Sequence, residues 1–121
     1  MEQNIEIQML NKVELLGRIG QVRIQTVGDK RVANFSVVTT ASYTSSKGEA
    51  IIETTWHNCT LWERWAGQLD GLAMGIPAHV TGRIRTRSFA TPSGETRHVN
   101  EVVVDDLQLT AKDAPIVPEK R

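Results

Sequence analysis

The stretch from Glu53 to Trp65 holds all three tryptophans and the only cysteine of the chain, and its residues alternate in character at strand period. Side chains two residues apart on a β-strand share a face. One face carries two indoles with polar groups between them, namely Trp56, Asn58, Thr60 and Trp62. The other face carries Thr55, His57, Cys59 and Leu61. Only the second face suits a hydrophobic core, so this strand is expected to offer two indoles to a flat ligand.

A chain of 121 residues is most simply one domain that is large enough to bury a core. We expect an N-terminal extension over residues 1–9, a folded domain over 10–110, and a short disordered tail over 111–121, where proline and charge are frequent. One cysteine cannot form an internal disulfide, which favours a reducing compartment. The sequence shows no signal-peptide pattern and no apolar run of the roughly 20 residues that a membrane helix needs. These features predict a cytoplasmic protein without membrane contact.

Strand-like alternation recurs along the chain and predicts an all-β fold. The first predicted strand starts at Asn11 and bends at Gly17, and a separate strand-like stretch follows from about Val22 to Thr26. The other predicted strands cover residues 32–40, 53–62, 78–89 and 97–109. Between the third and fourth strands, three apolar residues fall at helical spacing, namely Trp65, Leu69 and Leu72. They predict a short amphipathic helix that packs Trp65 against the core. Five strands with one short helix between the third and fourth match the oligonucleotide-binding (OB) fold, a five-stranded Greek-key barrel.

Three arginines alternate along the fourth predicted strand, and an aromatic residue ends the same face: Arg83, Arg85, Arg87 and Phe89. The formal net charge of the chain is zero, yet residues 81–100 hold four arginines and a single acid. Positive charge is therefore concentrated locally. A row of charges can also protect a sheet edge. Because no acid interrupts the row along the strand, and because arginine binds phosphate bidentately and stacks on bases, we favour phosphate contacts.

Four aromatic residues are candidates for stacking on nucleic-acid bases: Tyr43, Trp56, Trp62 and Phe89. Every base has a π face, and stacking on an aromatic side chain contributes about 1–3 kcal/mol per base regardless of sequence. Aromatic side chains combined with arginines predict a surface for single-stranded nucleic acid. Weaker candidates for phosphate contacts are Lys12, Arg18 and Arg31.

His57 and Cys59 share a face of the third predicted strand, but two side chains do not make a zinc site. No metal-binding or nucleotide-binding motif is present. A Cys–His nucleophile pair is a conceivable alternative. A buried cysteine beside a packed or interface histidine is the favoured interpretation, so we predict no catalytic residue, no metal and no cofactor.

Several segments together resemble the bacterial single-stranded DNA-binding protein (SSB) family: NKVELLGRIG, VANFSVVTT, TTWHNCTLW, GRIRTRSF and EVVVDDLQL. The resemblance covers about Leu10 to Leu109. It implies an OB fold, a homotetramer, and sequence-independent binding of single-stranded DNA in replication, recombination and repair at the nucleoid. It also implies base stacking by Tyr43, Trp56, Trp62 and Phe89. Finally, it implies a position at a subunit interface for His57.

Two departures from the family pattern bear on function. Asn58 stands where the family often has a basic residue, which implies a weaker phosphate contact there. Family members usually continue through a flexible linker to an acidic tip that recruits partner enzymes, whereas this sequence ends in PEKR, so we expect that tip to be absent. Two alternatives stay open: a dimeric primosomal-type OB protein, and an OB module that binds proteins but not nucleic acid.

Overall fold

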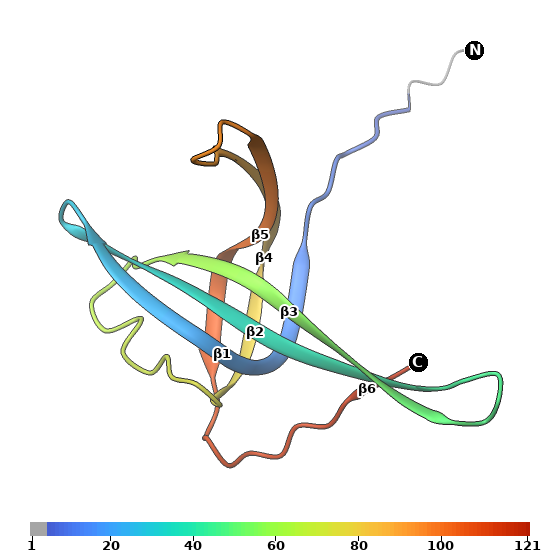
Figure 1. Cartoon of the computed structure of the whole chain (residues 1–121). Helices are drawn as coiled ribbons and strands as arrows, with labels where there is room; N and C mark the ends of the chain where they lie inside the picture. Colours follow the sequence, from blue (N-terminus) through green and yellow to red (C-terminus); the bar gives the residue numbers. More distant parts are fainter. Residues whose placement is uncertain (1–4) are drawn as a thin grey trace.

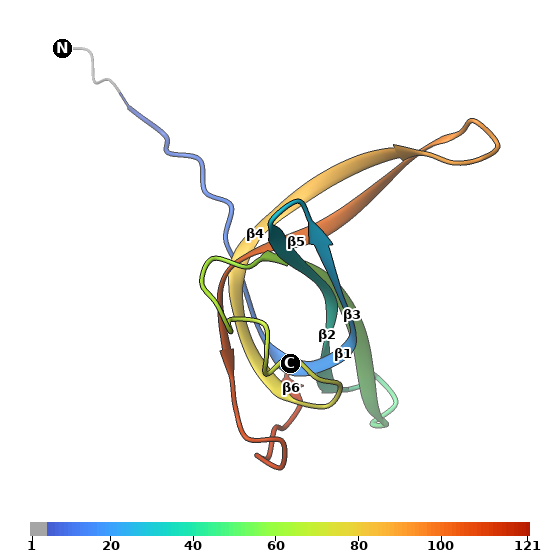
Figure 2. The same ribbon diagram turned by 90° about the vertical axis from the view of Figure 1, so that its left-hand side faces the viewer.

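The structure is a computed structural model and describes residues 5–121. Its elements, shown in Figure 1, are β1 (Val13–Val27), β2 (Lys30–Thr44), β3 (Ala50–Trp62), β4 (Pro77–Ala90), β5 (Thr96–Leu109) and the two-residue β6 (Glu119–Lys120). The long strands pair in the order β1-β4-β5-β3-β2, and β1 also pairs with β2. The sheet therefore closes into the barrel seen end-on in Figure 2. The predicted all-β class and five-stranded barrel are confirmed.

β1 closes the barrel because it bends and pairs with two different strands. Its first part, from Val13 to Arg18, pairs with β4, and the part from Arg18 onward pairs with β2. The register shifts between Ile19 and Val22, which is a β-bulge. A side chain at Gly17 would collide with the backbone carbonyl of Val38 on β2, so the bend needs glycine at this position.

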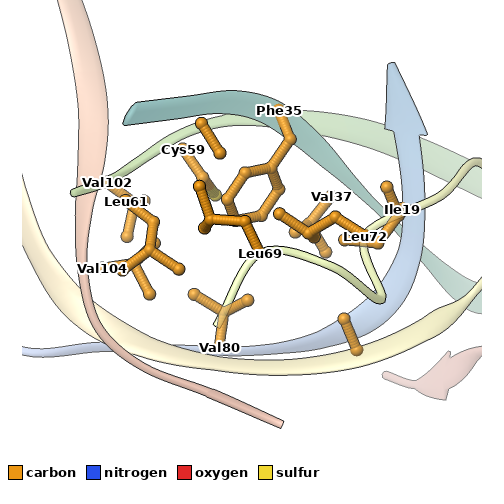
Figure 3. Packing of buried hydrophobic residues seen from close by; sticks show 12 residues of the cluster. Ile19, Phe35, Val37, Cys59, Leu61, Leu69, Leu72, Val80, Val102 and Val104 are labelled. Carbon is orange, nitrogen blue, oxygen red and sulfur yellow. The ribbon is translucent and has the colours of Figure 1, made fainter. Parts of the chain in front are cut away.

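The barrel interior is filled by apolar side chains from alternate positions on all five strands (Figure 3). The largest fully buried side chains are Ile19, Leu61, Leu69, Val37, Val80 and Cys59. Burying a Val, Leu or Ile side chain contributes about 1.5–3 kcal/mol. The core face predicted for β3 is confirmed at Cys59 and Leu61.

The predicted helix between β3 and β4 is wrong, and residues 5–121 contain no α-helix. The segment 63–76 is a series of turns whose hydrogen bonds run from the backbone N–H to the carbonyl three residues earlier, as from Leu72 to Leu69. Gly67, within the predicted helix, has a φ angle of 85°, which the interior of a right-handed helix cannot accommodate. Leu69 and Leu72 still enter the core. Trp65 does not, since it is 58% exposed, so the prediction that it packs inside is also wrong.

The two ends of the chain differ in how they meet the barrel. Residues 5–10 extend away from it in Figure 1 and are exposed, while residues 1–4 of the predicted extension lie outside the described residues. The segment 111–121, for which we expected disorder, leads from the end of β5 to β2 (Figure 1). β6 pairs in parallel with β2 at Ala41 and Ser42. Among the described residues, no helix is long and apolar enough to cross a membrane.

Candidate nucleic-acid interface

A groove of about 1000 Å³ runs along the outside of the barrel, bounded by β1–β3 on one side and the β4–β5 hairpin on the other; we call it the main groove. Alternate residues of the first three strands line it with polar side chains: Gln21, Arg23, Gln25, Asn34, Ser36, Asn58 and Thr60. Because the core takes the intervening positions, strand alternation places these groups on the outer face, where Thr60 alone of the seven is buried.

Trp62 and Phe89 both line the main groove, although they come from strands far apart in the sequence. They are 42% and 41% exposed, so each ring has a free surface. Trp56 lies on the same face of β3 as Trp62, is 62% exposed, and borders a smaller adjoining pocket. Asn58 and Asn100 line both pockets and connect them. Three of the four predicted stacking residues therefore lie on one continuous surface.

Tyr43 does not reach this surface. The unbroken β2–β3 register pairs Tyr43 with Ile51, and Val38 with Trp56. Residues an odd number apart on a strand point to opposite faces, so Tyr43 lies on the other face of the hairpin from Trp56. The structure thus separates Tyr43 from the other three aromatic residues.

The arginine row is less uniform than its sequence indicates. Arg85 and Arg87 line the main groove, whereas Arg83 does not, and its Nη1 lies 3.8 Å from Asp105 Oδ1. Glu101 stands directly opposite Arg85 in the β4–β5 ladder. Its Oε1 accepts hydrogen bonds from Arg85 Nε at 3.2 Å and Nη2 at 2.6 Å, and lies 3.5 Å from Arg87 Nε. No acid interrupts the row along its own strand, but the neighbouring strand supplies one.

Glu101 is a buried carboxylate, 8% exposed, in the wall of the main groove. Its second oxygen accepts a hydrogen bond from Thr60 Oγ1 at 2.9 Å. Burial works to raise the pKa of Glu101, but hydrogen bonds from Arg85 and Thr60 and the charges of Arg85 and Arg87 together hold this pKa below its usual value. Glu101 is therefore ionised at neutral pH.

The weaker phosphate candidates lie away from the main groove. Arg18 donates to the backbone carbonyls of Gly75 at 2.9 Å and Ala114 at 3.3 Å. The guanidinium of Arg31 forms ion pairs with Glu63 and with Asp70, where the nitrogen–oxygen distance is 3.3 Å. Both arginines thus hold parts of the protein together. Lys12 is exposed ahead of β1 and lines neither pocket.

Sequence reasoning missed Arg23, which lines the main groove from β1 opposite Asn34 on β2. The signal was present, because Gln21, Arg23 and Gln25 alternate as polar residues on one face of the strand. Glu101 was missed as well, since only the register of β4 against β5 places it beside Arg85.

His57 and Cys59 do not form a nucleophile pair. Burial raises the pKa of the Cys59 thiol to about 12, and Cys59 Sγ donates to the backbone carbonyl of His57 at 3.7 Å. The ring nitrogen Nε2 of His57 lies 2.8 Å from Thr39 Oγ1, and burial lowers the pKa of this histidine. Within residues 5–121, no three His, Cys, Asp or Glu side chains gather as metal ligands.

A closed barrel of five strands, with a groove of aromatic and cationic side chains across its outer face, defines an OB-fold protein. Residues 10–110 match the model of the single-strand binding protein family. The chain belongs to this family.

Its similarity to named proteins agrees with this membership. The chain is 33% identical over 110 residues to single-stranded DNA-binding protein 1 of Chlorobaculum tepidum, covering 87% of this chain and 68% of the relative. It is 37% identical over 106 residues to the single-stranded DNA-binding protein of Bacteroides thetaiotaomicron, covering 83% and 65%. The chain thus spans about two thirds of the length of these relatives.

Two solved structures share the fold. The Plasmodium falciparum SSB in complex with ssDNA superposes with a TM-score of 0.78 at 25% identity, covering 88% of this chain and 100% of that one. A deletion mutant of the single-stranded DNA-binding protein from Thermus aquaticus superposes with a TM-score of 0.71 at 20% identity, covering 84% and 51%.

Proposed function

We propose that this chain binds single-stranded DNA independently of sequence and that the main groove is the path of the DNA. Trp62, Phe89 and Trp56 would stack on bases, while Arg87 and Arg23 face the phosphates beside the Arg85 guanidinium. The observation that carries the proposal is that Trp62 and Phe89, from separate strands, line one groove together with Arg85 and Arg87. Aromatic platforms in a cationic groove are the general solution for binding single strands.

The other predicted DNA contacts have weaker support. Tyr43 lies outside the main groove, so it would touch only DNA that continues past the β2–β3 hairpin. Arg83 and Lys12 would add phosphate contacts at the margins. Arg18 and Arg31 are engaged within the protein, and we assign them structural roles.

We further propose that the chain assembles into a homotetramer with His57 near a subunit contact. Exposed apolar side chains support an assembly, because soluble proteins rarely expose several together: Ile5, Ile7, Met9, Leu10 and Leu16. Light scattering tests this proposal. A tetramer mass supports it, a dimer would favour the primosomal-type alternative, and a monomer would contradict any assembly.

The proposed role is that of a binding protein without a catalytic step, acting on single-stranded DNA during replication, recombination and repair in the cytoplasm, at the nucleoid. Family membership supports this role, and the buried, hydrogen-bonded thiol of Cys59 gives no support to a nucleophile.

A direct binding experiment tests the function. Fluorescein-labelled oligo-dT and a duplex hairpin of equal length are each titrated with the protein, and fluorescence anisotropy is recorded at several salt concentrations. We expect tight binding of oligo-dT that weakens as salt rises, since phosphate contacts release counterions, and much weaker binding of the duplex. No binding of oligo-dT at low salt, or equal binding of the duplex, would refute the proposal and favour a protein-interaction module.

A further inference from the structure

We propose that Glu101 is a positioning residue that sets how much positive charge the main groove offers to DNA. It holds Arg85 in an internal ion pair against the groove wall and leaves Arg87 and Arg23 as the phosphate contacts. The proposal rests on the proposed function of the groove and goes beyond it, because it divides the arginines into one that is neutralised within the protein and two that meet the ligand.

Both oxygens of Glu101 are occupied by named partners. Oε1 takes the two hydrogen bonds from Arg85, at 3.2 Å and 2.6 Å, and Oε2 takes the one from Thr60 at 2.9 Å. Thr60 lies on β3, Arg85 on β4 and Glu101 on β5, so the carboxylate joins three strands at one point of the groove. A charge-assisted contact of this kind is short and fixes the plane of the guanidinium.

Arg87 is held far less firmly than Arg85. Its Nε lies 3.5 Å from Glu101 Oε1, which is too long for a hydrogen bond of normal strength. Its side chain is exposed, whereas the Glu101 side chain is buried. Arg87 can therefore turn toward a phosphate without leaving Glu101 uncompensated, because Arg85 remains as the partner.

Arg85 has no such freedom. If it turned to a phosphate, a buried carboxylate would lose its main counter-charge inside a groove that also receives a polyanion. The Arg85 side chain is 49% exposed, but Glu101 is buried, and leaving a buried carboxylate without its partner is destabilising. Glu101 thus lowers the number of phosphates that the groove neutralises and keeps the Arg85 guanidinium in place beside the stacked bases.

The test is the salt dependence of oligo-dT binding, because the logarithm of the binding constant falls with the logarithm of the salt concentration by about 0.7 per phosphate contact on a single strand. Glu101→Gln keeps the size and an acceptor oxygen for Thr60 but removes the charge. We expect this variant to bind oligo-dT more tightly at low salt, with a slope steeper by about 0.7 for each arginine that it releases. A purely structural role would instead weaken binding or leave the slope unchanged.

Two further variants distinguish a specific effect of the Glu101–Arg85 pair from a general effect of charge. Glu95→Gln removes an equal charge from the tip of the same hairpin, where Glu95 is exposed and lies 3.9 Å from Arg97. We expect it to leave the slope unchanged, and an equal steepening would show a general charge effect and overturn the proposal. The double variant Glu101→Gln with Arg85→Gln removes both partners of the pair. It should retain the wild-type slope, and a slope shallower by about 0.7 would show that Arg85 already contacts phosphate in the wild type.

The double variant leaves no unpaired buried charge. Its salt slope therefore still shows whether Arg85 contacts phosphate, even if Glu101→Gln alone folds poorly. Thermal unfolding of each variant is measured alongside. A wild type that binds oligo-dT with a normal salt slope while Glu101→Gln shows no steepening overturns this inference and leaves the proposed function intact. A wild type that does not bind oligo-dT overturns both.

Discussion

A methyl group added to the backbone of Gly20 would lie 2.7 Å from Cζ3 of the Trp56 indole. Real side chains do not approach other atoms this closely, so the ring of Trp56 packs directly over the bare backbone of β1. Gly20 follows the bend at Gly17 and belongs to the same strand. Gly20 therefore makes room for the Trp56 ring, which is one of the proposed stacking residues.

The first prediction concerns this contact. The methyl group of Gly20→Ala would meet Ser36 Oγ as well as the indole. We expect it to displace both and to weaken oligo-dT binding about 3- to 10-fold, since part of the 1–3 kcal/mol of one stacking interaction is lost. Fluorescence anisotropy measures the change. Gly71→Ala is the matched control, because its methyl group would meet only the flexible end of the Leu109 side chain. Equal effects of the two substitutions on DNA binding would contradict the role of the contact.

The second prediction separates two exposed tryptophans that the sequence places three residues apart. Trp62 lines the main groove, whereas Trp65 lines neither pocket. Trp62→Ala should weaken oligo-dT binding by about 1–3 kcal/mol, which corresponds to roughly 5- to 150-fold. Trp65→Ala should change it less than twofold. A larger loss from Trp65→Ala than from Trp62→Ala would place the DNA on another face.

The third prediction is that Arg18 stabilises the fold and does not bind DNA. Its guanidinium donates to carbonyls of the turn before β4 and of the C-terminal segment. Arg18→Gln should lower the free energy of unfolding by about 1–2 kcal/mol, because backbone acceptors lose a charged donor. Urea unfolding measures this loss, and anisotropy should show the salt slope of oligo-dT binding unchanged. A slope shallower by about 0.7 would show a phosphate contact.

The fourth prediction follows from the buried thiol of Cys59, whose pKa is raised to about 12. Above pH 9 the unfolded chain loses this proton while the native protein keeps it. The native state then binds more protons, so the free energy of unfolding should fall as pH rises from about 9 toward 12. Urea unfolding at pH 8 and pH 10 tests this, with Cys59→Ala as the control that should show a flatter dependence. An identical pH dependence in both proteins would contradict the assignment.

Much of the fold follows from the sequence because strand alternation is local. The alternating polar and apolar residues of Asn58 to Leu61 fix which side of β3 faces the core. The helix predicted before β4 is wrong because Gly67 adopts a positive φ, which the apolar spacing of Leu69 and Leu72 cannot reveal. The spacing correctly predicts that both leucines are core residues, but it does not predict the turns that carry them into the core.

The candidate site was less predictable, because part of it depends on pairing between strands. Glu101 meets Arg85 only through the β4–β5 register, which no pattern within one strand encodes. The predicted strand ends at residue 40, whereas β2 continues to Thr44 and fixes Tyr43 on the face opposite Trp56. Arg23 was visible in the alternation of β1 but had no aromatic neighbour in sequence to mark it.

Intrinsic tryptophan fluorescence during titration with oligo-dT is the most direct measure of whether bases stack on β3. In a Trp65→Phe variant the signal comes only from Trp56 and Trp62, the two indoles of β3 that face the proposed DNA path. At low salt we expect strong, saturable quenching that added salt reverses, because stacked bases cover these rings. Binding of labelled oligo-dT by the same variant with unchanged tryptophan fluorescence would contradict it.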